Sequence, residues 1–166
     1  MRIVLAPAAL IALAPSAVYA VTYLNAEQAA RLMYQDADRF ETKTLVAEGN
    51  RSVSMRIARK GSLALGYVVF DEVVGKTEQI SYAVGVDTDG SIKQLEILAY
   101  RESHGGEIRL PAWRKQFVGK TASAPLRVGE DIANISGATL SSTHITDGVR
   151  RILVALSAAR RAGSLE

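Results

Sequence analysis

The sequence predicts a single α+β domain in which helices flank an antiparallel sheet. Short turns separate four stretches of alternating or largely β-branched and aromatic residues, at 51–59, 63–74, 78–86 and 92–100. Consecutive strands that are joined by short turns pair antiparallel. Helical periodicity lies on both sides of this group, and no repeat or linker divides the 166 residues, so we expect one domain.

The first twenty residues are typical of a secretion signal. Arg2 supplies a positive charge near the start of a mostly apolar run, which ends in Val18-Tyr19-Ala20, the small-residue pattern of a signal-peptidase site. We predict that residues 1–20 are a cleaved signal peptide, that 21–166 form the mature domain, and that the protein is periplasmic or otherwise extracytoplasmic. The alternative is that residues 1–20 remain as an anchor in the inner membrane.

A helix is expected between this signal and the first strand. Asn25 is a good N-cap for a helix that begins at Ala26 and continues to about Met33. Its apolar side is expected to contain Ala29, Leu32, Met33 and Phe40.

The four strand stretches differ in their expected burial. Residues 51–59 alternate apolar with mostly polar positions, which indicates a half-buried strand, whereas 63–74 are richer in Val, Tyr and Phe. Residues 78–86 and 92–100 flank Asp87-Thr88-Asp89-Gly90, which is strong turn chemistry. They form the clearest hairpin in the sequence.

Two helices are expected after the sheet. Pro111 can open a short helix that carries Trp113 and Phe117 on one face, where core packing is their default role. The last helix, at 139–161, has an apolar stripe at helical spacing that suits packing on the core, formed by Ile145, Val149, Ile152 and Leu156.

Composition excludes several classes of function. The chain has no cysteine, which rules out disulfides and thiolate chemistry, and its two histidines lack the spacing of a metal site. A net charge of +3 is too small for a nucleic-acid footprint. Neither the Gly-x-Ser-x-Gly elbow of serine hydrolases nor a glycine fingerprint for nicotinamide cofactors is present, so hydrolysis and direct NADH oxidation have no support.

Residues 136–143, Ser-Gly-Ala-Thr-Leu-Ser-Ser-Thr, are dense in hydroxyl groups and lie where the last helix begins. A helix N-terminus attracts anions, because its first N–H groups are unpaired and the helix dipole is positive there. Gly137 and Ala138 let a ligand approach the backbone, and Thr139 places a hydroxyl in the first turn. The pattern indicates a phosphate-binding site; an ordinary capped helix is the alternative.

Ser136-Gly137-Ala138-Thr139-Leu140-Ser141-Ser142 resembles the flavinylation motif of the FMN-binding domain family, which includes components of sodium-pumping NADH:quinone oxidoreductase and of the Rnf complex. Residues 100–109 and 113–120 resemble a second conserved block of that family. The two blocks and the residues between them cover most of positions 66–153. The resemblance implies an FMN-binding domain whose FMN phosphate is esterified to Thr139 by a flavin transferase.

The resemblance also implies which other residues bind the cofactor. Around the threonine these are Ser136, Gly137, Ala138, Leu140 and Ser141, and in the second block Tyr100, Glu102 and His104. Alternatives remain for several of them: the two serines could merely cap the helix, His104 could be solvated, and Glu102 could satisfy backbone N–H groups near Gly105 and Gly106.

One position departs from the family pattern. An aspartate usually stands three residues before the motif serine, and this chain has Ala133 there, with Asp131 as the nearest carboxylate. The resemblance implies an exported flavoprotein that exchanges electrons with a membrane-bound redox protein, a cytochrome or a quinone-linked reductase, rather than a substrate-turnover enzyme. The Ala133 departure leaves open a docking module that binds FMN without a covalent bond.

Overall fold

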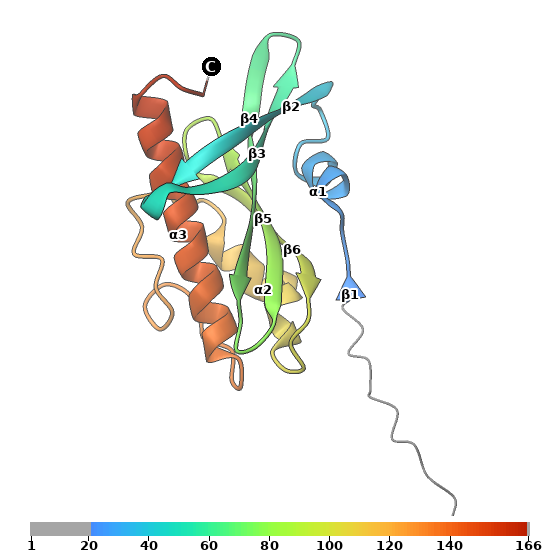
Figure 1. The fold of residues 1–166 in the computed structure, drawn as a ribbon, viewed down its shortest axis with the longest axis vertical. Helices are drawn as coiled ribbons and strands as arrows, with labels where there is room; N and C mark the ends of the chain where they lie inside the picture. Colours follow the sequence, from blue (N-terminus) through green and yellow to red (C-terminus); the bar gives the residue numbers. More distant parts are fainter. Residues whose placement is uncertain (1–20, 166) are drawn as a thin grey trace, which may run out of the picture.

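The computed structural model describes residues 21–165, which form one antiparallel sheet with helices on both of its faces (Figure 1). The strand order is β1-β6-β5-β4-β3-β2. The strands are β1 (Val21–Thr22), β2 (Arg39–Ala47), β3 (Arg51–Lys60), β4 (Leu63–Val74), β5 (Gln79–Asp87) and β6 (Ile92–Tyr100). The α-helices are α1 (Ala26–Met33), α2 (Pro111–Arg114) and α3 (Thr139–Arg161), and 3-10 turns occupy Glu48–Asn50, Gly106–Arg109 and Lys115–Phe117. The predicted α+β class is confirmed. The predicted signal peptide lies outside the described residues.

The predicted hairpin between β5 and β6 is confirmed. The Asp87 N–H donates to the Ser91 carbonyl at 2.9 Å, and the Gly90 N–H donates to the Asp87 carbonyl at 2.9 Å. The Asp89 carboxylate accepts from the backbone N–H of Ser91 at 2.8 Å, which stabilises the turn.

Strand β2 is absent from the sequence-based expectation. Strand β2 pairs along its whole length with β3 at the edge of the sheet. Only Leu45 and Ala47 of this strand are buried, because the other side chains of an edge strand are exposed or half-buried. The assignment of Phe40 to the apolar side of the first helix is wrong. Phe40 lies in β2 and packs with the residues of that helix on the same face of the sheet, where the Arg31 guanidinium stands 5.7 Å from the centroid of the Phe40 ring.

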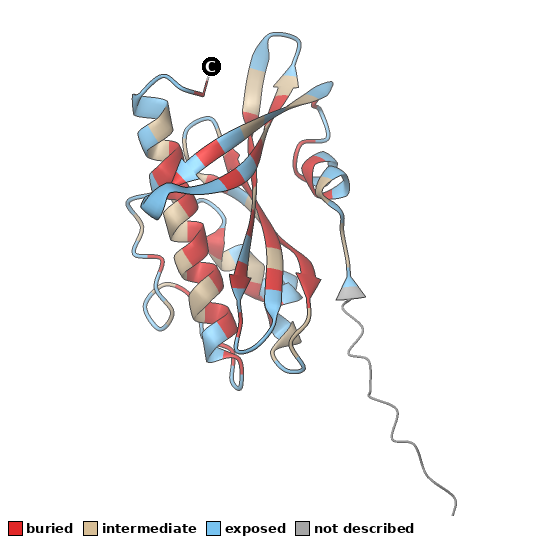
Figure 2. Cartoon of the chain, in the orientation of Figure 1, coloured by how far each residue is buried: buried red, intermediate tan, exposed pale blue. Residues whose placement is uncertain are grey.

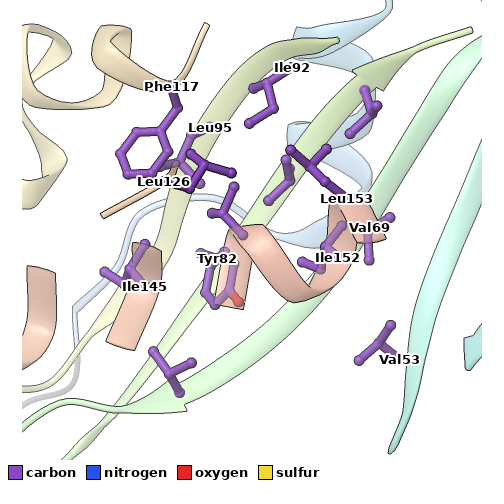
Figure 3. Close-up of a cluster of buried hydrophobic side chains, with 14 of the residues drawn as sticks. Val53, Val69, Tyr82, Ile92, Leu95, Phe117, Leu126, Ile145, Ile152 and Leu153 are labelled. Carbon is purple, nitrogen blue, oxygen red and sulfur yellow. The ribbon is translucent and has the colours of Figure 1, made fainter. Parts of the chain in front are cut away.

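Helix α3 covers one face of the sheet and encloses most of the core (Figures 2 and 3). Its predicted stripe, Ile145, Val149, Ile152 and Leu156, is buried. Tyr82 of β5 lies beneath the helix and donates its hydroxyl to the Asp71 carboxylate at 2.9 Å. Burial and the neighbouring Asp71 charge raise the pKa of Tyr82 well above its usual value, so the phenol stays protonated.

Helix α1 covers part of the opposite face. Asn25 forms the predicted cap: its side chain accepts from the Gln28 N–H at 2.9 Å, and the Gln28 side chain accepts from the Asn25 N–H at 2.8 Å. Ala29, Ala30 and Met33 are buried against the sheet, whereas Leu32, expected on the same side, is 43% exposed.

The segment after β6 closes the open edge of that strand. Ile92 exchanges backbone hydrogen bonds with Gly119 and Lys120, and the Arg114 guanidinium donates to the Leu95 carbonyl at 2.9 Å. Trp113 and Phe117 are buried, with ring centroids 5.0 Å apart in an edge-to-face arrangement, so their predicted core role is confirmed. No helix within residues 21–165 has the length and apolarity to cross a membrane.

Candidate functional site

Three segments that are distant in the sequence meet at one end of the sheet: the β4–β5 turn, the loop after β6 and the start of α3 (Figure 1). They enclose a cavity of about 580 Å³, within the usual size range of ligand pockets. Its walls are Lys76, Thr77, Glu102, Ser103, His104, Gly137, Ala138, Thr139, Leu140 and Ser141. The fold thus brings seven of the nine predicted site residues together in one cavity.

Helix α3 begins at Thr139, as the sequence predicted, and presents its N-terminus to the cavity. Thr139 and Leu140 are exposed, and the N–H groups of this first turn have no helical acceptor. Gly137 has a φ of +77° and no heavy atom within 4 Å of the position that a Cβ would take. The backbone before the helix is therefore open to a ligand.

The Thr139 hydroxyl accepts a hydrogen bond from the Asn134 side-chain amide, with 3.1 Å between Nδ2 and Oγ1. Asn134 was not among the predicted site residues, since its place in a polar turn gives no sign that it reaches five residues ahead. The contact orients the hydroxyl without burying it, and it leaves the threonine proton available.

Tyr100 lies under the cavity rather than in its wall. Its hydroxyl donates to the His104 carbonyl and is 3.4 Å from the buried Ser141 hydroxyl. Burial raises the pKa of Tyr100 and outweighs the opposing contact with Ser141, so the phenol remains a donor. Tyr100 therefore holds two wall residues in place, His104 from the 100–109 block and Ser141 from the 136–142 block.

Glu102 shapes the cavity through the β4–β5 turn. Its carboxylate accepts from the backbone N–H groups of Lys76, Thr77 at 2.7 Å and Glu78 at 2.9 Å, and from the Thr77 hydroxyl at 3.2 Å. Desolvation opposes ionisation, but these hydrogen bonds outweigh it and leave the pKa of Glu102 below its usual value. The expected alternative, N–H groups near Gly105 and Gly106, is wrong: Glu102 satisfies those of another turn.

Lys76, Thr77 and Ser103 are wall residues that the sequence reasoning missed. Ser103 flanks Glu102 and His104 and could have been inferred from that neighbourhood. Lys76 and Thr77 carry no motif, and only the pairing of β4 with β5 brings their turn to the cavity.

The predicted residues Ser136 and His104 differ in their surroundings, as do Ser142 and Thr143, two further hydroxyl residues of the 136–143 stretch. Ser136 is exposed and does not line the cavity. His104 is exposed in the wall, with its Nδ1 2.9 Å from the Ser103 hydroxyl. Ser142 is buried and donates to the Ala138 carbonyl at 3.1 Å, while Thr143 lines a different hollow. Within residues 21–165, no group of three His, Cys, Asp or Glu side chains could hold a metal ion.

The backbone of Ala133 is held on both sides by the second block. Its N–H donates to the Gln116 side chain at 2.7 Å, and its carbonyl accepts from the Trp113 indole N–H at 2.8 Å. Its side chain is exposed. Asp131 does not replace the missing carboxylate, because it accepts from the Arg127 N–H at 2.9 Å and pairs with Lys120 at 2.9 Å within its own loop.

Comparisons with known proteins agree with this geometry. Residues 75–154, which include the whole cavity wall, match the model of the FMN-binding domain family. The chain is also 30% identical over 128 residues to the G subunit of the proton-translocating ferredoxin:NAD(+) oxidoreductase complex of Clostridium ljungdahlii. That match covers 72% of this chain and 65% of the relative, so the chain spans less than two thirds of the relative's length.

Proposed function

Because the chain contains an FMN-binding domain that resembles the clostridial G subunit, we propose that it is an exported flavoprotein with FMN esterified to Thr139. In this role it exchanges electrons with a membrane-bound redox protein, a cytochrome or a quinone-linked reductase. A flavin transferase attaches the cofactor. FMN supplies the redox chemistry, while the chain binds and orients it.

The observation that carries the proposal is the position of Thr139. Its hydroxyl is exposed in the wall of the cavity and belongs to the first residue of a 23-residue helix. A phosphate on this oxygen would lie beside the unpaired N–H groups and the positive end of the helix dipole. The opening at Gly137 leaves room for it.

The remaining wall suits an FMN molecule attached at this point. Leu140 is 47% exposed at the wall and offers an apolar surface, whereas the Ser103 and Thr77 hydroxyls can bind polar groups of the cofactor. Among the described residues of the wall, Glu102 is the one carboxylate, and its oxygens accept hydrogen bonds from the backbone N–H groups of the β4–β5 turn.

The position of β1 relates the start of the described chain to the cavity. Val21 pairs with Tyr100, so the described chain begins beside the end of β6 that supports the cavity floor. If residues 1–20 act as an anchor, this connection would hold the cavity close to the membrane surface. If they are cleaved as a signal peptide, the domain would meet its partner by diffusion.

Co-expression with a flavin transferase tests the proposal. After denaturation, intact mass should show an increment of one FMN less one water, and the band should fluoresce in a gel, because a phosphoester survives unfolding. Thr139→Ala should remove the increment, while Thr139→Ser should keep part of it. Thr143→Ala is the matched control in the same helix and should leave labelling intact, since Thr143 lies outside the cavity.

Restoring the family aspartate gives a second arm of the same experiment. Ala133→Asp should raise the labelled fraction, because the side chain at this position is exposed and accessible to the transferase. Ala133→Asn controls for size without charge. A fluorescent band that persists in Thr139→Ala would assign the ester to another hydroxyl.

A second candidate function follows from the same departure at Ala133. If the transferase does not recognise this chain, the domain binds FMN without a covalent bond and serves as a docking module. Flavin that co-purifies with the native protein but separates on denaturation, in wild type and in Ala133→Asp, would favour this candidate.

A further inference from the structure

Lys76 brings a positive charge to the cavity that no motif in the sequence indicates. It lines the wall from the β4–β5 turn, which is a different element from the helix that carries Thr139. The turn is well anchored, because the Glu102 carboxylate accepts the backbone N–H groups of residues 76–78. The backbone of Lys76 is therefore held in place at the wall, while its side chain is exposed.

The charge of Lys76 is not neutralised by the chain itself. Among residues 21–165, the Lys76 ammonium forms no hydrogen bond or ion pair. Glu102, the only carboxylate among the described wall residues, accepts hydrogen bonds from the backbone of the turn and from the Thr77 hydroxyl instead. Lys76 is also the only lysine or arginine among the described residues that line the wall.

The proposed phosphate on Thr139 already has partners in the first turn of α3, so Lys76 is available for the rest of the cofactor. If FMN is bound, its reduction by two electrons from the redox partner, with one proton from solvent, would give the ring a negative charge that the neutral oxidised ring lacks. A nearby cation stabilises this charged form selectively, and such charges tune a flavin's electronics.

We propose that Lys76 places its ammonium group beside the flavin ring and that this charge raises the reduction potential of the cofactor. This inference rests on the proposed function, since it requires FMN in the cavity. It assigns to Lys76 a role in setting the potential and none in attaching the cofactor.

The test compares three variants of the flavin-loaded protein by spectroelectrochemistry and intact mass. Lys76→Gln removes the charge, Lys76→Arg keeps it, and Lys60→Gln is the matched control. Lys60 is the exposed last residue of β3 and pairs with Leu63, the first residue of β4, so it lies at the other end of β4 from Lys76 and does not line the cavity. Lys76→Gln should favour the reduced form about tenfold less, which lowers a two-electron midpoint potential by about 30 mV. Lys76→Arg and Lys60→Gln should stay close to wild type.

The shift should also shrink in 1 M salt, because exposed charges are screened over about 3 Å at that ionic strength. Equal potentials in wild type and Lys76→Gln, with equal flavin labelling, would overturn the role of Lys76 and leave the proposed function intact. A loss of labelling in Lys76→Gln without a change in potential would assign Lys76 to cofactor attachment and overturn the inference. A wild-type protein that binds no flavin would overturn the proposed function and this inference together.

Discussion

Gly105 and Ala138 lie in direct contact at the edge of the cavity: a Cβ atom on Gly105 would fall 2.1 Å from the Cβ of Ala138. Gly105 belongs to the loop after β6, and Ala138 is the N-cap of α3. The 100–109 and 136–142 blocks thus each contribute one small residue to a contact that no larger pair would allow. This contact sets how closely the loop approaches the phosphate-binding end of the helix.

Gly105→Ala should destabilise the protein more than its backbone conformation alone explains. Gly105 has a φ of +84°, and Gly119, with a φ of +80°, has no heavy atom within 4 Å of its Cβ position. We expect Gly119→Ala to cost about 1 kcal/mol of unfolding free energy for the left-handed backbone. Gly105→Ala should cost about 1–3 kcal/mol more, because it also forces the loop away from the helix.

Urea unfolding of the two variants measures this difference. The double variant Gly105→Ala with Ala138→Gly should recover part of the loss, since the residues are in contact and their effects are coupled. Equal costs for Gly105→Ala and Gly119→Ala would mean that the loop does not pack against Ala138.

Glu102→Gln should lower stability in a pH-dependent way. The folded-state pKa of Glu102 lies below its unfolded value of 4.5, so its contribution is present above that pH and is lost as the pH falls through the folded pKa. At neutral pH the substitution should cost about 1–2 kcal/mol, because a charged acceptor of three backbone N–H groups is replaced by a neutral one. Wild type and variant should converge in stability as the pH falls well below 4.5.

Glu107→Gln is the control for Glu102→Gln. Glu107 is exposed and its side chain forms no hydrogen bond or ion pair within residues 21–165. Its replacement should change the unfolding free energy by less than about 0.5 kcal/mol. A difference between wild type and Glu102→Gln that stays constant from pH 7 to pH 3 would contradict the role given to the carboxylate.

Ile152→Ala should cost about 2–4 kcal/mol of unfolding free energy, because Ile152 is only 1% exposed and lies on the side of α3 that faces the core (Figure 3). Val154, two residues later on the same helix, is 51% exposed, and Val154→Ala should cost less than about 0.5 kcal/mol. Chemical denaturation of both variants gives the comparison. A loss below about 1 kcal/mol for Ile152→Ala would place this face of the helix in solvent.

Much of the fold was predictable from local patterns. The β5–β6 hairpin followed from Asp87-Thr88-Asp89-Gly90 between apolar stretches, and the start of α3 at Thr139 followed from the hydroxyl-rich stretch before a helical stripe. These elements carry strong periodicity, which depends only on neighbouring residues. Strand β2 was missed because an edge strand needs few apolar side chains, and its partner β3 supplies its hydrogen bonds.

The sequence by itself determined the α+β class and most residues of the cavity wall, since those residues lie in two short contiguous blocks. Only the tertiary structure decided that Glu102 supports a turn 24 residues earlier, that Asn134 holds the Thr139 hydroxyl, and that Lys76 enters the wall. The pairing of β4 with β5 places their turn at the end of the sheet where α3 begins. The Glu102 carboxylate is directed to this turn because it accepts backbone N–H groups that need an acceptor there. Such contacts join residues with no common periodicity, so they exist only once the sheet and the helix have packed together.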